Sequence, residues 1–418
     1  MRTTRSRLAA LAVVALLLAA CSESVKDDTA DGGSATTTPA GEEPKTRTTR
    51  GVTDDTILVG GTVYDLYYGD ARVGVEARLK ELNDAGGVHG RKIEVVDIAN
   101  DNNEATRSLQ NVQRLVEQEK VFALLPVMSG GFGGGDFIVD KGIPTFGWGT
   151  HPAFCDNTIA FGFTGCVTDP SLKRGSNALG TGLEKLLGTT DQTIAFLGED
   201  NDSSKGGVEL LAASVKDKGF DVVLQDTSIP APPDILGDES PFVSKVMKAD
   251  DGNPPDIVYL LATLSGTKLA AGLQGAGFKG KIFTPSYSPL LLGAPGYDGV
   301  FVNTQFSMDP EVPANAAMLK AVRAVKPDAQ LNLAISAGYW TTDFFISALE
   351  KTGKDLTVEK LLQTLNDGFT YEVPDVVGKS TWPANHELSV PCSAITEVKG
   401  KEFVPVVPLT CGENIDVN

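Results

Sequence analysis

Strand-like and helix-like segments alternate along the chain from about residue 52 onward. A first series contains apolar strands such as TILVGG and VFALLPV, and a second series contains TIAFLGE and DIVYLLAT. Segments with helical periodicity, such as SSKGGVELLAASVKDKG, lie between most of these strands. Strands separated by helices of roughly ten to fifteen residues form right-handed βαβ units and parallel sheets. The two series therefore predict an α/β fold with two doubly wound parallel-sheet lobes.

The length and composition of the chain agree with a two-domain globular protein. Its 418 residues exceed the usual size of a single hydrophobic core, and 41% hydrophobic with 22% charged residues is ordinary for such a chain. The formal net charge of −18 disfavours general binding to nucleic acid or to an anionic membrane surface. The histidines His89, His151 and His386 are far apart in the sequence, which disfavours a histidine-based metal site or histidine-driven catalysis.

The first residues have the pattern of an export signal. A basic stretch, MRTTRSR, precedes the apolar run LAALAVVALLLAA, which is shorter than a membrane span. The junction LAAC ends at Cys21 and matches the lipobox of bacterial lipoproteins, in which this cysteine is lipidated and becomes the mature N-terminus. We therefore predict a signal peptide at 1–20 and lipidation of Cys21; an ordinary signal peptide with a chance cysteine is the alternative. Removal of residues 1–20 deletes three arginines and no acid, which changes the net charge from −18 to −21.

Residues 22–50 contain one valine and no other large apolar side chain. Such a segment cannot bury enough apolar surface to offset the entropy lost on ordering, so we predict a lipidated disordered tether at 21–51. An anchor followed by a tether places the folded part outside the cytoplasmic membrane.

The other four cysteines are even in number, which favours disulfides in an exported protein. Three pairings are possible, and proximity in the sequence favours Cys155–Cys166 and Cys392–Cys411. A four-cysteine zinc site is disfavoured because no C-x-x-C spacing occurs.

Motifs that could indicate an enzyme are incomplete. The glycine-rich turn SGGFGGGDF has Asp136 where the third glycine of a G-x-G-x-x-G dinucleotide motif is required. GAGFKGKI resembles a phosphate-binding loop, but Ile282 replaces the Ser or Thr that ligates magnesium, and the loop precedes a strand. The acidic loop GEDNDSSKG does not have EF-hand spacing, and no G-x-S-x-G motif occurs. We therefore predict no enzymatic activity, no cofactor and no metal site.

The run NDAGGVHGRKIEVVDIANDNNEATRSLQNVQRLVEQEKVFALLPVMSGG, which begins at Asn83, resembles the first lobe of leucine/isoleucine/valine-type solute-binding proteins of ABC importers. In that family a helix that ends in N-x-A-G-G-[IV]-x-G leads into the second strand. The resemblance extends more loosely from about residue 52 to 410, and a lipoprotein anchor suits it. It implies a type I periplasmic binding protein fold.

The resemblance also implies three hinge crossings between the lobes, near residues 166–170, 298–304 and 374–382. Lobe 1 would comprise 52–167 with 303–375, and lobe 2 would comprise 168–298 with 380–418. Ligands of open parallel sheets meet the carboxyl ends of the strands, so the glycines of the signature run lie at the edge away from the ligand.

The candidate ligand site is predicted from the residues at these carboxyl ends of the strands. In amino-acid-binding members of the family, a Ser and a Thr in turns that match Ser129 and Thr150 bind the ligand carboxylate; simple capping of the turns is the alternative. Tyrosines after the first strand and Trp148 could form a wall, and loops of lobe 2 supply the facing side chains. The predicted ligand-binding residues are Tyr64, Asp65, Tyr68, Ser129, Gly130, Trp148, Thr150, Asp200, Ser204, Thr263, Ser286 and Tyr287.

The chain departs from the amino-acid binders at two places. Those proteins carry an acidic residue where this chain has Ser286, and Tyr-Gly where it has Ser204 and Lys205. Because a buried unpaired ammonium is costly, either Asp65 or Asp200 replaces that acid or the ligand has no amino group. The sequence favours a small carboxylate and leaves a free amino acid open.

The resemblance thus predicts a monomeric, lipid-anchored, extracytoplasmic protein that captures a small solute and delivers it to a membrane permease of an ABC transporter. The alternative is a ligand-sensing receptor domain that reports to a signalling partner.

Overall fold

The computed structural model describes residues 50–417 apart from Pro233 and Thr263. The predicted signal peptide, the lipidation site Cys21 and almost all of the predicted tether lie outside this part of the chain. Within the described residues, no helix combines the length and the apolar composition that a membrane crossing requires.

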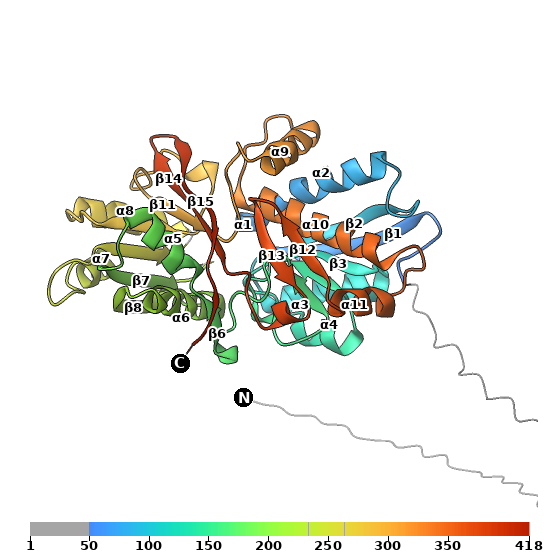
Figure 1. The fold of residues 1–418 in the computed structure, drawn as a ribbon, viewed down its shortest axis with the longest axis horizontal. Helices are drawn as coiled ribbons and strands as arrows, with labels where there is room; N and C mark the ends of the chain where they lie inside the picture. Colours follow the sequence, from blue (N-terminus) through green and yellow to red (C-terminus); the bar gives the residue numbers. More distant parts are fainter. Residues whose placement is uncertain (1–49, 233, 263, 418) are drawn as a thin grey trace, which may run out of the picture. The chain divides into compact units, whose positions relative to one another are not determined.

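The first lobe is built on a parallel five-stranded sheet in the order β2-β1-β3-β4-β5 (Figure 1). Its central strand β3, ALLPVM, is buried along its whole length, as expected for a parallel strand that is covered on both faces. The strands are β1 (Thr56–Val63), β2 (Lys92–Asn100), β3 (Ala123–Met128), β4 (Thr145–Gly147) and β5 (Ala160–Gly162).

Helices from two distant parts of the sequence cover this sheet. Helices α2 (Ala71–Asp84) and α10 (Leu333–Thr352) pack against each other at two glycines. A Cβ atom on Gly74 would lie 2.1 Å from the carbonyl oxygen of Ile335, and one on Gly338 would lie 2.3 Å from that of Ala71. The other helices of this lobe are α1 (Asp65–Tyr68), α3 (Ala105–Gln113), the π-helix η1 (Arg114–Gln118), α4 (Gly135–Lys141), the 3-10 turn η2 (Pro152–Phe154), α9 (Pro313–Val325) and α11 (Val358–Asn366).

The second lobe is built on a seven-stranded sheet in the order β15-β14-β11-β10-β9-β7-β8. Its strands from β7 to β11 are parallel, whereas β14 and β15 are antiparallel. The strands are β7 (Thr193–Glu199), β8 (Asp221–Ile229), β9 (Ile257–Leu261), β10 (Lys281–Thr284), β11 (Phe301–Thr304), β14 (Cys392–Lys399) and β15 (Glu402–Cys411). The helices are η3 (Pro170–Leu172), α5 (Ala178–Leu187), α6 (Asp202–Asp217), α7 (Ser240–Val246), α8 (Leu264–Gly275) and η4 (Pro289–Leu291).

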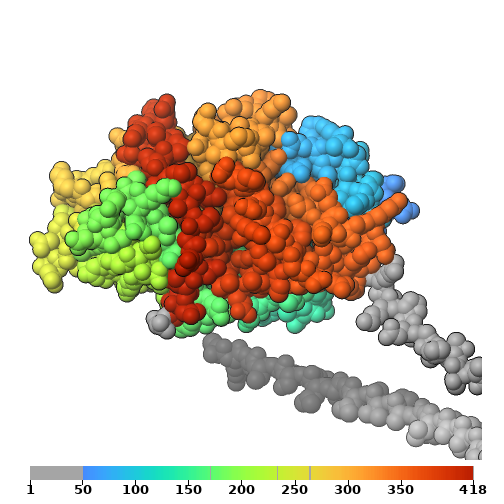
Figure 2. Space-filling view, in the orientation of Figure 1, coloured from blue at the N-terminus to red at the C-terminus, as the bar shows by residue number. Residues whose placement is uncertain are grey.

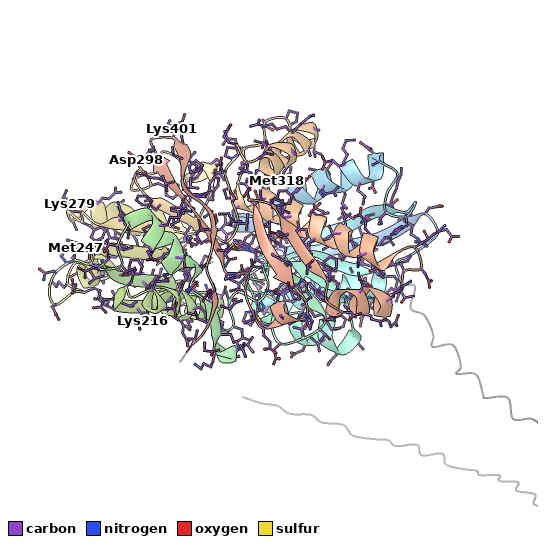
Figure 3. The ribbon with its side chains drawn as sticks, in the orientation of Figure 1. Lys216, Met247, Lys279, Asp298, Met318 and Lys401 are labelled. Carbon is purple, nitrogen blue, oxygen red and sulfur yellow. A yellow bond between two sulfur atoms is a disulfide. The ribbon has the colours of Figure 1, made fainter. Side chains whose placement is uncertain are left out.

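The tail SVPCSAITEVKGKEFVPVVPL has the sequence pattern of a terminal hairpin around Lys399 and Gly400. The structure confirms this prediction, because Lys399 pairs with Glu402 at the end of β14 and β15. At its tip the backbone N–H of Gly400 donates to a carboxylate oxygen of Asp298 at 2.7 Å, and Asp298 and Lys401 lie near each other in Figure 3. In Figure 2 the last residues, in dark red, form a band beside the green α5, which contacts β15.

Three connections join the lobes, as the fold class predicted, and two of them run side by side. The backbone N–H of Val390 donates to the carbonyl of Thr164 at 2.8 Å, and Gly165 forms a bridge with Ser389. Nearby, η5 (Ala384–His386) packs on the first connection, where the N–H of Cys166 donates to the carbonyl of Asn385 at 2.9 Å. A short pair of strands, β6 (Arg174–Ser176) and β16 (Asn414–Asp416), follows in the second lobe.

Two expected crossing positions coincide with strands. The segment 298–304 contains β11, which belongs to the second sheet, and 374–382 contains β13 (Val377–Thr381), which pairs with β12 (Thr370–Val373). The second and third connections therefore come after these strands in the sequence, because β11 is paired with β10 in the second lobe and β13 is paired with β12. The exact lobe boundaries within the connecting segments stay a prediction.

Both predicted disulfides are confirmed. Cys155 bonds to Cys166, and Cys392 bonds to Cys411, which it faces directly in the β14–β15 pair. The first pair closes a loop at the beginning of a connection between the lobes, and the second holds the C-terminal strand to its neighbour.

Candidate functional site

The carboxyl ends of the two parallel sheets contact each other. In the first lobe Tyr64 follows β1 and Thr150 lies shortly after β4, and in the second lobe Glu199 ends β7. The hydroxyl of Ser203, in the first turn of α6, donates a 3.1 Å hydrogen bond to the backbone carbonyl of Thr150. The two edges that the strand directions predict as the ligand site are therefore in contact.

Four aromatic side chains form a continuous group at the first edge, which we call the aromatic cluster: Tyr64, Tyr67, Tyr68 and Trp148. Neighbouring rings meet edge to face, with centroids 5.0 Å apart for Tyr64–Tyr67, 6.4 Å for Tyr67–Tyr68 and 6.3 Å for Tyr68–Trp148. The indole N–H of Trp148 donates to the side-chain oxygen of Gln305 at 2.9 Å. This bond fixes the indole orientation, and the edge-to-face contacts order the remaining rings.

The second edge carries a buried acid at the end of β7. Glu199 is buried at the end of β7, and the side-chain amide of Asn201 lies 3.5 Å from one of its carboxylate oxygens. Burial, and then the negative charge of Glu199, raise the pKa of Tyr68 to about 12. Burial followed by the charges of Glu199 and Asp101 also raises the pKa of Tyr64. Glu199 therefore acts electrostatically on the aromatic cluster from the other lobe.

A second buried acid, Asp101, connects the strand ends of the first lobe. It accepts hydrogen bonds from the hydroxyl of Ser129 at 3.0 Å, from the hydroxyl of Thr62 at 3.3 Å and from the backbone N–H of Asn103 at 2.9 Å. Burial raises the pKa of Asp101, and this effect is larger than that of the hydrogen bonds, which lower the pKa. Asp101 thus ties the ends of β1, β2 and β3 together.

The hydroxyl of Ser129 donates one hydrogen bond and accepts another within the first lobe. Its hydroxyl donates to Asp101, and its oxygen accepts from the backbone N–H of Gly131 at 3.1 Å. The second of these is a turn-capping contact. Next to it Gly130 is exposed at the edge, and Thr150 is half-buried. The roles of Ser129, Gly130 and Thr150 in ligand binding stay predictions.

The two acids that could have replaced the missing family acid are paired with bases of their own lobes. Asp65 lies 2.6 Å from the guanidinium of Arg72, and Asp200 lies 2.6 Å from the ammonium of Lys205. Both acids are exposed. The negative charges of these two acids are therefore largely compensated by Arg72 and Lys205.

The other predicted residues of lobe 2 lie in different surroundings. Ser204 is buried in the first turn of α6, where its backbone N–H donates to the side chain of Asn201 at 2.8 Å. Tyr287 is buried with its ring stacked 3.8 Å from that of Phe403. The carbonyl of Ser286 accepts from the hydroxyl of Tyr297, and Ser286 is one of the residues that line a small cavity. Thr263 lies outside the described residues.

Sequence reasoning missed Glu199, Asp101 and Gln305 as site residues. Glu199 was weighed only as part of an acidic loop, although it ends the apolar strand TIAFLGE. Asp101 directly follows β2, so the rule that ligands meet strand carboxyl ends could have found both acids. Gln305 lies after β11, where the crossing was expected, and no motif marks it. Among the described residues, no group of three His, Cys, Asp or Glu side chains could hold a metal ion.

Comparisons with known proteins agree with this geometry. A family model described as periplasmic binding protein matches residues 62–402. A fatty acid ABC transporter substrate-binding protein from Thermomonospora curvata is 20% identical, with a TM-score of 0.71 and coverage of 90% of this chain and 98% of that chain. The leucine-, isoleucine-, valine-, threonine- and alanine-binding protein from Brucella ovis, in its closed conformation, is 16% identical, with a TM-score of 0.69 and coverage of 87% and 95%.

A solute-binding protein of an ABC transporter from R. palustris, solved with benzoate, is 17% identical, with a TM-score of 0.65 and coverage of 86% of this chain and 98% of that chain. No match was found among the curated proteins. At these identities the solved structures show a common fold. The family match covers most of the chain, and the family implies a location outside the cytoplasm. The chain belongs to the periplasmic binding protein family and has the type I fold that its sequence resemblance predicted.

Proposed function

We propose that this protein captures a small solute between its two lobes and delivers it to the permease of an ABC transporter. The observation that carries the proposal is the contact of the two sheet edges at Ser203 and Thr150, with the aromatic cluster on the first edge and Glu199 at the end of β7 on the second edge. Rings on one edge and an acid on the other are groups that could recognise a small molecule from both lobes at once.

The solute would be captured when the two lobes close around it. A ligand that contacts both edges stabilises the closed arrangement over the open one, by as much as its affinity differs between the two. The fatty acid, amino-acid and benzoate proteins to which the chain is similar support a small organic ligand. We propose a small carboxylate or an amino-acid-like molecule, bound by the predicted residues at the two edges together with Glu199.

We further propose that the protein is a monomer held at the outer face of the cell membrane through lipidated Cys21 and the segment 22–50. The lipobox and the polar composition of that segment support the lipid anchor and the tether. A signalling receptor would need a partner surface, and no observation on the described residues favours one.

A thermal-shift screen tests the capture of solutes. The mature protein is heated with amino acids, keto acids, aromatic acids and fatty acids, each at several concentrations. A true ligand at about one hundred times its dissociation constant adds roughly 2.7 kcal/mol to the free energy of unfolding, so the melting temperature rises with concentration. Small-angle scattering with the same ligand is expected to give a smaller radius of gyration. A ligand that binds by calorimetry without any change in radius contradicts capture by closure.

A further inference from the structure

The three connections between the lobes meet at Trp148, the residue that follows β4 in the first lobe. From the first connection, which follows β5, the hydroxyl of Thr164 donates to the backbone carbonyl of Trp148 at 2.8 Å. From the second, which follows β11, the side-chain oxygen of Gln305 accepts the indole N–H of Trp148 at 2.9 Å and lies 3.5 Å from the hydroxyl of Thr164. The third reaches the same point through Thr164, whose carbonyl accepts from the backbone N–H of Val390 at 2.8 Å. Each connection is therefore one or two hydrogen bonds away from a ring of the aromatic cluster.

The backbone beside Trp148 is packed tightly on the first connection. A Cβ atom on Gly149 would lie 2.0 Å from the carbonyl oxygen of Gly165, so the two residues meet backbone to backbone. Gly149 has a φ of 105°, which glycine adopts without steric cost. The backbone N–H of Val167 also donates to the carbonyl of Gly149 at 3.1 Å. The end of β4 and the first connection therefore form one packed unit.

The indole ring is held from the second connection. Besides its hydrogen bond to Gln305, the ring of Trp148 contacts that of Phe306 edge to face, with centroids 5.5 Å apart. Phe306 in turn contacts Phe163, which follows β5, at a centroid distance of 5.4 Å. On its other side the indole meets the ring of Tyr68. A movement of Gln305 and Phe306 would therefore shift the indole, and with it one wall of the candidate ligand site.

We propose that Gln305 is a positioning residue that couples the indole of Trp148 to the hinge, so that the ring moves as the lobes open and close. The inference rests on the proposed function, because capture by closure requires the connections to move. Hinge closure is absorbed by a few residues in connecting segments, and Gln305 lies in such a segment. Gln305 acts on the solute through Trp148, and the aromatic wall takes its final position only when the hinge has closed.

Hydrogen exchange of the indole N–H tests the contact without any ligand. The mature protein is labelled at the indole nitrogen, which gives one N–H signal for each of its three tryptophans, and Trp148→Phe identifies the signal of Trp148. Gln305→Leu removes the acceptor, so exchange at Trp148 is expected to become about three- to tenfold faster. Gln305→Glu keeps an acceptor oxygen and is expected to stay within about twofold of the wild-type rate. Gln363→Leu, at an exposed position of α11, is the matched control and is expected to leave the rate unchanged.

A change in the third connection tests the coupling to the hinge. Asn385 lies in η5, where its side chain accepts from the backbone N–H of Thr381 at 2.5 Å and donates to the carbonyl of Leu388 at 2.8 Å. Asn385→Ala loosens this connection and is expected to speed exchange at Trp148 at least about twofold. In a Gln305→Leu background it is expected to add nothing further, because the two changes act through one contact. Unchanged exchange in Asn385→Ala, together with faster exchange in Gln305→Leu, overturns the coupling.

Thr164→Val gives the same test from the first connection if Asn385→Ala does not fold. It removes the hydroxyl that lies between the carbonyl of Trp148 and the side chain of Gln305. Faster exchange that Gln305→Leu masks supports the coupling, and effects that multiply in the double variant overturn it.

Solute probes separate this inference from the proposed function. Isoleucine, benzoate and octanoate are titrated by calorimetry, with small-angle scattering of the same samples. A probe that binds and lowers the radius of gyration is expected to shift the indole signal of Trp148 and to bind Gln305→Leu about three- to tenfold more weakly, with Gln305→Glu close to wild type. A probe that closes the lobes while the signal of Trp148 stays in place overturns the inference and leaves the proposed function standing. No binding of any solute, in these titrations or in the wider screen, contradicts the proposed function, and the exchange rates then decide the coupling alone.

Discussion

The hydroxyl of Ser203 donates a 3.1 Å hydrogen bond to the backbone carbonyl of Thr150, from the first turn of α6 to the carboxyl end of the other sheet. The bond joins segments that belong to different lobes, so it exists only while the two edges are in contact. A hydrogen bond of this kind contributes about 0.5–1.5 kcal/mol. It therefore favours the closed arrangement without being needed for either lobe to fold.

Ser203→Ala is expected to weaken ligand binding about two- to tenfold and to leave the free energy of unfolding without ligand nearly unchanged, because only the closed arrangement loses a bond. Calorimetry gives the affinity and chemical denaturation gives the stability. Ser244→Ala, at an exposed position of α7, serves as the control. Full wild-type affinity in Ser203→Ala would show that the bond does not contribute to closure.

The packing of α2 on α10 depends on two glycines. An added Cβ on Gly74 would meet the carbonyl oxygen of Ile335 at 2.1 Å, so Gly74→Ala must separate the helices. We expect a loss of at least about 2 kcal/mol in the free energy of unfolding, and a similar loss for Gly338→Ala. Gly266→Ala in α8 is the control: no atom lies within 4 Å of its added Cβ, and the helix is expected to gain up to about 1 kcal/mol. Denaturant titration of the three variants checks the order; equal stabilities would contradict the close-packing argument.

Most of the fold follows from periodicity and strand direction. The alternation of strands with helices predicted two parallel-sheet lobes, and the turn at Lys399 and Gly400 predicted the terminal hairpin, because both are local patterns. The pair β12–β13 and the pair β6–β16 were missed. The residues of β6 and β16 are more than two hundred positions apart, and each strand has three residues, so neither has a local signal.

The sequence predicted that the site lies at the carboxyl ends of the sheet strands, but it did not predict the contacts between the side chains there. Tyr64, Tyr68 and Trp148 were predicted as a wall, and the structure brings them together in one cluster. The pairing of Asp65 with Arg72 depends on how α1 meets α2, and the bond of Ser129 to Asp101 depends on the register of neighbouring strands. Such geometry is tertiary and cannot be read from residue types.

The two disulfides close loops with sequence separations of 11 and 19 residues. Short loops limit the entropy removed from the unfolded chain, so we expect each bond to contribute about 2–4 kcal/mol to the free energy of unfolding. Denaturation of the paired variants Cys155→Ala with Cys166→Ala, and Cys392→Ala with Cys411→Ala, measures each contribution. Non-reducing peptide mapping of the wild type is the control; a free thiol at any of the four positions in exported protein would rule out the pairing.

Membrane attachment is expected to depend on Cys21 alone. Cys21→Ala removes the thiol that would be lipidated, so the protein is expected to leave the membrane fraction or to keep its signal peptide. The folded residues from 52 onward lie beyond the predicted tether, so ligand binding is expected to be unchanged. Fractionation with immunodetection measures attachment, and Ser22→Ala is a control at the next position. A C21A protein that stays in the membrane fraction with its signal peptide removed would contradict the lipobox assignment.

His386 is expected to make stability depend on pH. It lies buried against the rings of Phe161 and Trp382, with centroids 4.9 Å and 4.7 Å away, and its Nε2 donates to the side-chain oxygen of Asn366 at 2.7 Å. Its Nδ1 makes no hydrogen bond with the described residues, so the protonated ring gains little to offset its burial, and the backbone of Ala160 raises the pKa less than burial lowers it. Burial accordingly lowers the pKa of His386 to about 4.

The direction in which stability changes with pH follows from the protonation of His386 in the folded and the unfolded chain. Above pH 6.5, the ordinary pKa of histidine, the ring is neutral in both the folded and the unfolded chain, and its contribution is fully present. As the pH falls towards the folded-state pKa of about 4, the unfolded chain binds a proton that the folded chain does not, so stability is lost. From pH 7 to pH 5 we expect a loss of about 2 kcal/mol from this residue. His151, whose pKa burial also lowers to about 4 against the pull of Asp202, is expected to add a loss of the same sign.

Denaturant titrations at pH 7, 6 and 5 measure this dependence. His386→Phe keeps a ring between Phe161 and Trp382 but cannot titrate, so its stability is expected to fall less steeply with pH than that of the wild type, whatever its value at pH 7. His89→Asn is the control, because His89 is exposed and its backbone has a φ of 50°, which Asn tolerates. The control is expected to keep the wild-type slope. Equal slopes for His386→Phe and wild type would show that His386 is protonated alike in the folded and unfolded chain.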